Sequence, residues 1–185
     1  MSGMLRLPSL VTCAGLVCGF VALLFAARHD FGRAALLVGV AALLDALDGL
    51  LARRGRGGCE FGTNLDSLAD LVSFGVVPAF ALYLRALYEL GGLGVAACAG
   101  FVVCGALRLA RFPLVRNERF FVGLPIPPAG VALAALCVSG PPPLVAALAA
   151  AGLGALMVSR LPFPTISGLA ALGRERASRF AGRPD

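Results

Sequence analysis

The sequence predicts an all-α, polytopic membrane protein, built as a helix bundle of about six transmembrane helices. Of its 185 residues, 59% are hydrophobic and only 14% are charged. That composition is too apolar for an ordinary soluble domain. Long apolar runs recur along the chain and are separated by short segments that hold most of the charged residues. Both the composition and this alternation indicate repeated membrane crossings.

Six apolar segments are expected to cross the membrane. They cover residues 10–27, 34–52, 65–84, 90–109, 125–138 and 143–158. The last two are shorter than the roughly 20 residues that a full helical crossing requires. We therefore expect one membrane-embedded domain over residues 1–160, followed by an Arg-rich tail over residues 161–185 that is cytoplasmic or interfacial.

The arginines predict the orientation of the bundle. With six crossings, 13 of the 16 arginines fall on the side that holds both termini, and only Arg28, Arg33 and Arg85 fall on the other. Basic residues are enriched in cytoplasmic loops. The sequence therefore predicts a multi-pass protein of the cell (inner) membrane, with both termini and the polar segment after residue 52 on the cytoplasmic side.

The charge and the cysteines exclude several other functions. The net charge is +6, and every basic residue is an arginine. These arginines lie mainly in short loops between apolar segments, so we expect membrane lipids and phosphate-bearing substrates as partners, and no nucleic acid. The six cysteines are scattered within mostly apolar segments. They match neither a disulfide framework nor a zinc site, and packing is their expected role.

One polar stretch stands out, residues 45–70, with the sequence DALDGLLARRGRGGCEFGTNLDSLAD. Asp45 and Asp48 are three residues apart, which places them on one face of a helix. Asp66 and Asp70 are four apart and share one face of the following helix. Glycines and arginines lie between the two pairs and predict a turn. Two helices joined there could direct all four carboxylates toward one site.

Carboxylates at membrane depth are costly and usually mark function. Four that converge would repel one another unless cations lay between them. Sites made only of oxygen ligands favour hard divalent ions. We therefore expect two ions, Mg²⁺ or Mn²⁺ with Ca²⁺ as an alternative, held by Asp45, Asp48, Asp66 and Asp70. The simpler interpretation, acidic residues that solvate a loop, explains neither the spacing nor the apolar flanks.

The same stretch resembles a known motif. It reads Asp45-x-x-Asp48-Gly49-x-x-Ala52-Arg53, then eight residues, then Gly62-x-x-x-Asp66-x-x-x-Asp70. This pattern resembles the motif of the CDP-alcohol phosphotransferase family at each of its eight defining positions. Three later stretches, DLVSFGVVPA, GALRLARF and FFVGLPIPPAG, resemble the phosphatidylserine synthase branch of that family.

The resemblance implies an activity and a set of residue roles. An enzyme of this branch transfers the phosphatidyl group of CDP-diacylglycerol to the hydroxyl of L-serine and releases CMP. Metal ions on the four aspartates would bridge the diphosphate, and Asp70 would also be the general base. The expected contacts to the CDP group are Thr12, Gly49, Ala52, Arg53, Gly62 and Asp66. From the sequence alone, close helix packing explains Gly49 and Ala52 equally well.

The sequence leaves more than one candidate for the acceptor alcohol. Arg108 and Arg111, three residues apart, could bind the serine carboxylate or a lipid phosphate. They could also be membrane-interface anchors. A sibling enzyme that uses glycerol 3-phosphate or inositol phosphate is an alternative, and a non-enzymatic membrane protein is a further one. A homodimer is also compatible with the sequence. His29, the only histidine, lies on the predicted opposite side, which argues against a phosphohistidine intermediate.

Overall fold

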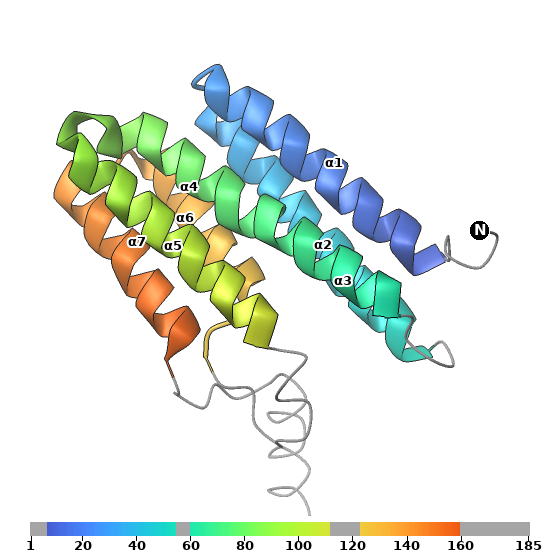
Figure 1. The fold of residues 1–185 in the computed structure, drawn as a ribbon. Coiled ribbons are helices and arrows are strands. Elements are labelled where there is room, and N and C mark those ends of the chain that lie inside the picture. Colours follow the sequence, from blue (N-terminus) through green and yellow to red (C-terminus); the bar gives the residue numbers. More distant parts are fainter. Residues whose placement is uncertain (1–6, 55–59, 112–122, 160–185) are drawn as a thin grey trace, which may run out of the picture.

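The structure is a computed structural model. It describes residues 7–54, 60–111 and 123–159, and their side chains over 9–50, 61–111 and 123–159. The expected Arg-rich tail and the glycine-rich turn before residue 60 therefore lie outside the described residues. Within the described ranges the chain is helical and contains no strand, which confirms the all-α prediction (Figure 1).

Within the described residues, six helical segments follow one another along the chain. Each of the six predicted apolar segments corresponds to one of them. The third is a continuous series of helical turns from Glu60 to Leu90 and is longer at both ends than predicted. The elements are α1 (Leu7–Ala27), α2 (Phe31–Arg54), α3 (Glu60–Asp70), η1 (Leu71–Val76), α4 (Val77–Leu82), η2 (Tyr83–Leu87), η3 (Tyr88–Leu90), α5 (Gly92–Arg111), α6 (Ile126–Ser139) and α7 (Pro143–Val158).

Three of these segments are long and apolar enough to cross a membrane: Ser9–Ala27, Phe61–Leu90 and Gly92–Arg111. Helices α6 and α7 are apolar but shorter. Helix α2 has 24 residues, and its apolar sequence is interrupted by Asp45 and Asp48. The structure thus supports a multi-pass bundle, with the number of full crossings only roughly as predicted.

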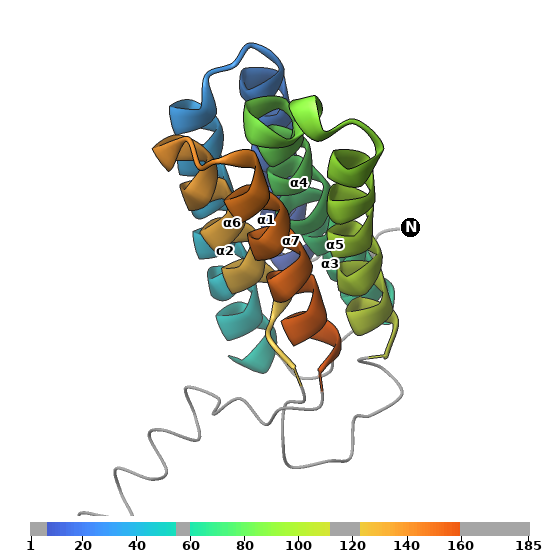
Figure 2. The ribbon, with the colours of Figure 1, turned by 90° about the vertical axis from the view of Figure 1, so that its left-hand side faces the viewer.

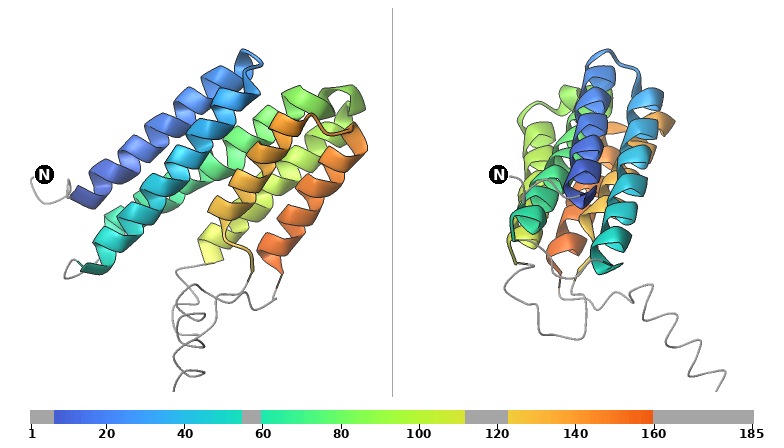
Figure 3. Two further views of the ribbon diagram at one scale, coloured as in Figure 1. Left: turned by 180° about the vertical axis from the view of Figure 1, so that it is seen from behind. Right: turned by 90° about the vertical axis from the view of Figure 1, so that its right-hand side faces the viewer.

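The helices run up and down between two ends of the bundle (Figure 2). Three short connections, α1 to α2, η3 to α5 and α6 to α7, lie together at one end. Helix α1 lies along α2, and α5 lies along α7. Helix α6 contacts both α2 and α4 and so links the two halves (Figure 3). Phe74, Phe101, Leu82 and Leu133 are among the buried side chains of the core.

The helix that follows α3 is not regular. Segment η1 is a π-helix, in which the N–H of Val77 donates to the carbonyl of Val72, five residues earlier. Pro78 follows, and it has no N–H to donate to the carbonyl of Phe74 four residues before it. Helix α6 approaches closely at this point, because a Cβ added to Gly130 would lie 2.4 Å from that carbonyl oxygen. The π-helical turn therefore follows directly after Asp70 and packs against Gly130.

Candidate functional site

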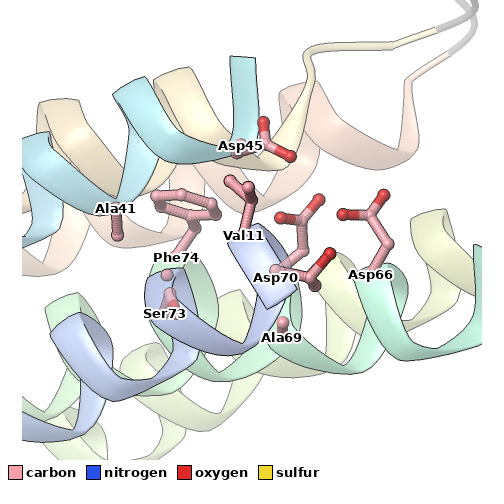
Figure 4. A pocket seen from close by; sticks show the side chains of 10 residues that line it. Val11, Ala41, Asp45, Asp66, Ala69, Asp70, Ser73 and Phe74 are labelled. Atoms are coloured by element: carbon pink, nitrogen blue, oxygen red, sulfur yellow. The ribbon is translucent and has the colours of Figure 1, made fainter. Parts of the chain in front are cut away.

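Three aspartates converge at one end of the bundle. Asp45 lies on α2, and Asp66 and Asp70 lie on α3, where the four-residue spacing places both on the face toward α2 (Figure 4). One carboxylate oxygen from each of the three lies within 4.8 Å of the others. All three side chains are half-buried. The sequence prediction that both helices direct carboxylates into a shared site therefore agrees with this geometry.

The fourth aspartate has a different partner. Asp48 is only 6% exposed, and its Oδ2 accepts a hydrogen bond from the hydroxyl of Thr12 on α1, which is 8% exposed. Asp48 does not belong to the group of three carboxylates that lie within reach of one ion. Thr12 thus joins α1 to α2 and also lines the pocket beside the cluster, and its contact to the nucleotide stays a prediction.

A small pocket lies beside the aspartates, between the helices of the bundle. Its lining comes from α1, α2, α3 and the π-helical segment: Val11, Thr12, Gly15, Ala41, Asp45, Asp66, Ala69, Asp70, Ser73 and Phe74. Figure 4 shows the carboxylates of Asp45, Asp66 and Asp70 facing one another at its polar end. The opposite end is apolar, with the ring of Phe74.

Ser73 is a site residue that the sequence reasoning missed. It is 2% exposed, and its Oγ has no hydrogen-bond partner among the described residues. A buried hydroxyl without a partner is costly, so it calls for a ligand or a water molecule. A signal for it did exist in the sequence, since Ser73 is the one polar residue in the apolar run after Asp70.

The donor set fits a divalent ion. Ligand oxygens around one Mg²⁺, each about 2.1 Å from it, lie about 3 to 4 Å apart. The separations within the group of Asp45, Asp66 and Asp70 have the same scale. Three close carboxylates in a partly buried site repel strongly, and a cation removes that cost. The cluster therefore has the chemistry of an oxygen-ligated metal site.

The remaining motif positions are described only in part. A Cβ at Gly49 would meet nothing within 4 Å, so no described residue packs there. A Cβ at Gly62 would reach only the Oγ of Ser9, at 4.0 Å. Ala52 and Arg53 belong to the last turn of α2, and their side chains lie outside the described residues.

The two arginines of α5 differ in their surroundings. Arg108 is half-buried, and its Nε has no hydrogen-bond partner among the described residues. It lies close enough to Asp70 for the two charges to interact. Arg111 is exposed in the last turn of the helix. The structure thus brings Arg108, but not Arg111, toward the aspartate cluster.

Comparison with known proteins supplies the family. The profile of the family described as CDP-alcohol phosphatidyltransferase matches residues 5–172. The chain belongs to the CDP-alcohol phosphatidyltransferase family. This membership confirms the resemblance that the motif indicated, and it makes the chain an enzyme of the transferase class.

Several relatives are similar to this phosphatidyltransferase over most of its length. The CDP-diacylglycerol–serine O-phosphatidyltransferase of Bacillus subtilis is 36% identical over 159 residues, which cover 85% of this chain and 89% of the relative. An enzyme of the same name from Helicobacter pylori is 41% identical over 71% of this chain and 56% of its own. The archaetidylserine synthase of Methanothermobacter thermautotrophicus is 34% identical over 90% of this chain and 73% of its own. The names agree with the predicted branch.

Proposed function

We propose that this phosphatidyltransferase moves the phosphatidyl group of CDP-diacylglycerol to the hydroxyl of L-serine. The serine oxygen forms a bond to the lipid-side phosphorus, the bond from that phosphorus to the CMP oxygen breaks, and CMP leaves. The hydroxyl proton passes to a base. The products are phosphatidylserine and CMP. The names of the relatives support the substrates, and the carboxylate cluster supports the chemistry.

The observation that carries the proposal is the convergence of Asp45, Asp66 and Asp70 from two helices. These residues would hold the divalent metal, Mg²⁺ or Mn²⁺ with Ca²⁺ as the alternative. Asp48 would belong to a second ion, with Thr12 fixing its orientation. Bound at this site, the metal would supply positive charge to the diphosphate and to the departing CMP.

We assign Asp70 as the general base. It is the last of the three along the chain and directly precedes the π-helical segment. It also lines the pocket together with Ser73. An acceptor hydroxyl in that pocket would lie beside it. A general base must come within about 3 Å of the proton that it takes, directly or through one water.

We assign acceptor binding to Arg108, whose Nε has no hydrogen-bond partner among the described residues. A guanidinium matches a carboxylate with two parallel hydrogen bonds, and L-serine carries a carboxylate. Arg111, exposed at the helix end, suits a lipid phosphate better. Gly49, Ala52, Arg53 and Gly62 would contact the CDP group, as in the family motif.

Release of CMP from CDP-diacylglycerol tests this function. Purified protein in detergent micelles is given CDP-diacylglycerol, Mg²⁺ or Mn²⁺, and one acceptor at a time: L-serine, glycerol 3-phosphate or inositol phosphate. We expect CMP and phosphatidylserine with serine only. Turnover with glycerol 3-phosphate or inositol phosphate instead would assign the chain to a sibling activity. No turnover with any acceptor would contradict the enzymatic proposal.

We also propose that the aspartate cluster faces the cytoplasm from the inner membrane. The asymmetry of the arginines supports this orientation. Reporter fusions after Arg54 and at the C-terminus should both report the cytoplasmic side, and a fusion after Arg28 the opposite side. A reporter after Arg54 on the outside would reverse the orientation.

A further inference from the structure

An open hollow of about 830 Å³ lies at the end of the bundle away from the aspartates. It is formed by the connection between α1 and α2, by η2 and by the last turn of α6. The lining residues are Arg28, His29, Asp30, Phe31, Gly32, Arg85, Cys137 and Val138. Figure 2 shows the connection between α1 and α2 at the end where the other short connections lie. The hollow is thus separate from the carboxylate site.

The charges in this hollow are not balanced. Asp30 is its one acidic residue, and Asp30 is already engaged by Arg33, at 3.3 Å between Oδ2 and Nη1. Arg28 and Arg85 make no ion pair among the described residues, including with Glu89, one turn beyond Arg85. Even with Asp30 counted, the two arginines leave the lining of the hollow with a net positive charge.

The guanidinium of Arg85 is held in place on two sides. It lies over the ring of Phe31, with 5.5 Å between Cζ and the ring centroid. On another side is Gly140, where an added Cβ would lie 2.5 Å from Nη2 of Arg85. Gly140 has φ of 63°, a conformation that favours glycine. The aromatic ring and the glycine thus give the guanidinium of Arg85 neighbours on two sides at the edge of the hollow.

The loop that carries the second arginine is also ordered. The N–H groups of His29 and Asp30 donate to the carbonyls of Ala26 and Phe25, at 2.9 and 3.0 Å, and so close the end of α1. His29 has φ of 59°, which is uncommon for a residue other than glycine and is often found at functional positions. The carboxylate of Asp30 accepts the N–H of Arg33, at 3.0 Å, and caps α2.

The surroundings favour a lipid as the ligand. Val138 of the lining is an exposed apolar side chain, and the helices that border the hollow carry further ones, among them Leu24 on α1 and Leu36 on α2. A molecule bound to the arginines would therefore extend along an apolar surface. This arrangement matches a phospholipid, whose phosphate lies at the interface and whose chains lie in the hydrocarbon layer.

We propose that the hollow binds the phosphate of an anionic phospholipid in the leaflet opposite the aspartate site, through Arg28 and Arg85. A guanidinium pairs with two phosphate oxygens at once. Arg33 is excluded from this role because it does not line the hollow and its guanidinium is already paired with Asp30. The proposal depends on the membrane location of the bundle and not on the acceptor or the donor of the reaction.

Native mass spectrometry of the detergent-purified protein tests the site. Phosphatidylglycerol is titrated into the wild type, into Arg28→Ala combined with Arg85→Ala, and into the matched control Arg33→Ala, an arginine at the same end that already has a partner. Because each interfacial arginine adds about 1 kcal/mol, the double variant should bind the lipid on the order of thirtyfold more weakly. The control should bind as the wild type does.

Two further arms separate the sources of the phosphate and the effects on folding. Inorganic phosphate at matched concentration should not displace the lipid; displacement would assign the hollow to a free anion. None of the variants changes the aspartate end, so any lipid bound there is the same in each and does not affect the difference between them. Arg85→Lys, which keeps the charge, provides a second variant if the double variant unfolds early in a thermal scan. Equal loss in the double variant and in Arg33→Ala would overturn the proposal.

Discussion

Thr12 donates a hydrogen bond to Asp48, so that α1 fixes the orientation of an aspartate that lies 36 residues further along the chain, on α2. Both residues are almost fully buried. The pair lies beside the pocket that Asp45, Asp66 and Asp70 share. Helix α1 therefore contributes to the site both through its pocket-lining residues and through the position of the Asp48 carboxylate.

The first prediction concerns this pair. Thr12→Val keeps the shape of the side chain but removes the donor, which leaves the Asp48 carboxylate buried without that hydrogen bond. Hydrogen bonds to charged groups contribute about 1.5–3 kcal/mol. We expect the concentration of Mg²⁺ that gives half-maximal turnover to rise about tenfold. Thr12→Ser keeps the hydroxyl and should behave as the wild type, and equal behaviour of the two variants would contradict the role of the hydroxyl.

The second prediction separates chemistry from binding. Asp70→Asn keeps the size of the side chain and one ligating oxygen but removes its basicity. General-base losses are on the order of 10²–10⁴-fold, so turnover should fall within that range while binding of CDP-diacylglycerol weakens less. Asp48→Asn should weaken the binding of metal and nucleotide together. Turnover and binding are measured on the same preparation.

A different result for Asp70 would reassign it. If Asp70→Asn kept near-normal turnover at saturating metal, the residue would be a metal ligand alone. The base would then have to be another group in the pocket. The convergence of Asp70 with Asp45 and Asp66 would still hold, because it rests on the geometry of α2 and α3.

The sequence predicted the carboxylate cluster because the information is local. The spacing of Asp66 and Asp70 fixes their common face on α3, and the motif implies that α2 lies opposite. The partner of Asp48 could not be predicted, because α1 meets α2 through packing along the whole bundle. The apolar runs also predicted where helices form. Each of the six predicted segments overlaps one of the six helical segments among the described residues.

The π-helical segment could not be located from the sequence either. Pro78 indicates a disturbed helix, but not which turn adjusts. An extra residue in a turn rotates the following side chains by about 100° around the helix. Ser73 itself lies three residues after Asp70 and seven after Asp66, so the ordinary helical spacing already places it on the face of the two aspartates.

The third prediction concerns metal removal. Because three carboxylates converge within reach of one ion, EDTA should abolish turnover, and Mg²⁺ or Mn²⁺ should restore it. Removal of the metal should also lower the midpoint of thermal unfolding, since the carboxylates then repel one another. The variant Asp66→Asn, with one charge fewer, should show a smaller shift. Full turnover after exhaustive chelation would exclude the metal site.

The last prediction concerns the glycine contact behind the site. A Cβ at Gly130 would lie 2.4 Å from the carbonyl oxygen of Phe74, a backbone atom that cannot move away alone. Gly130→Ala should therefore displace the π-helical segment that follows Asp70 and should lower stability by about 1–3 kcal/mol. Turnover should fall as well, because Ser73 and Asp70 move with that backbone.

The matched control for this variant is Gly152→Ala on α7. A Cβ at Gly152 meets nothing within 4 Å, so alanine should stabilise the helix by up to about 1 kcal/mol. Thermal unfolding in detergent and the release of CMP are measured for both variants. Opposite signs of the two stability changes, with turnover lost only in Gly130→Ala, would show that close packing of α6 holds the catalytic segment in position. Normal turnover in a destabilised Gly130→Ala would limit this contact to a role in stability.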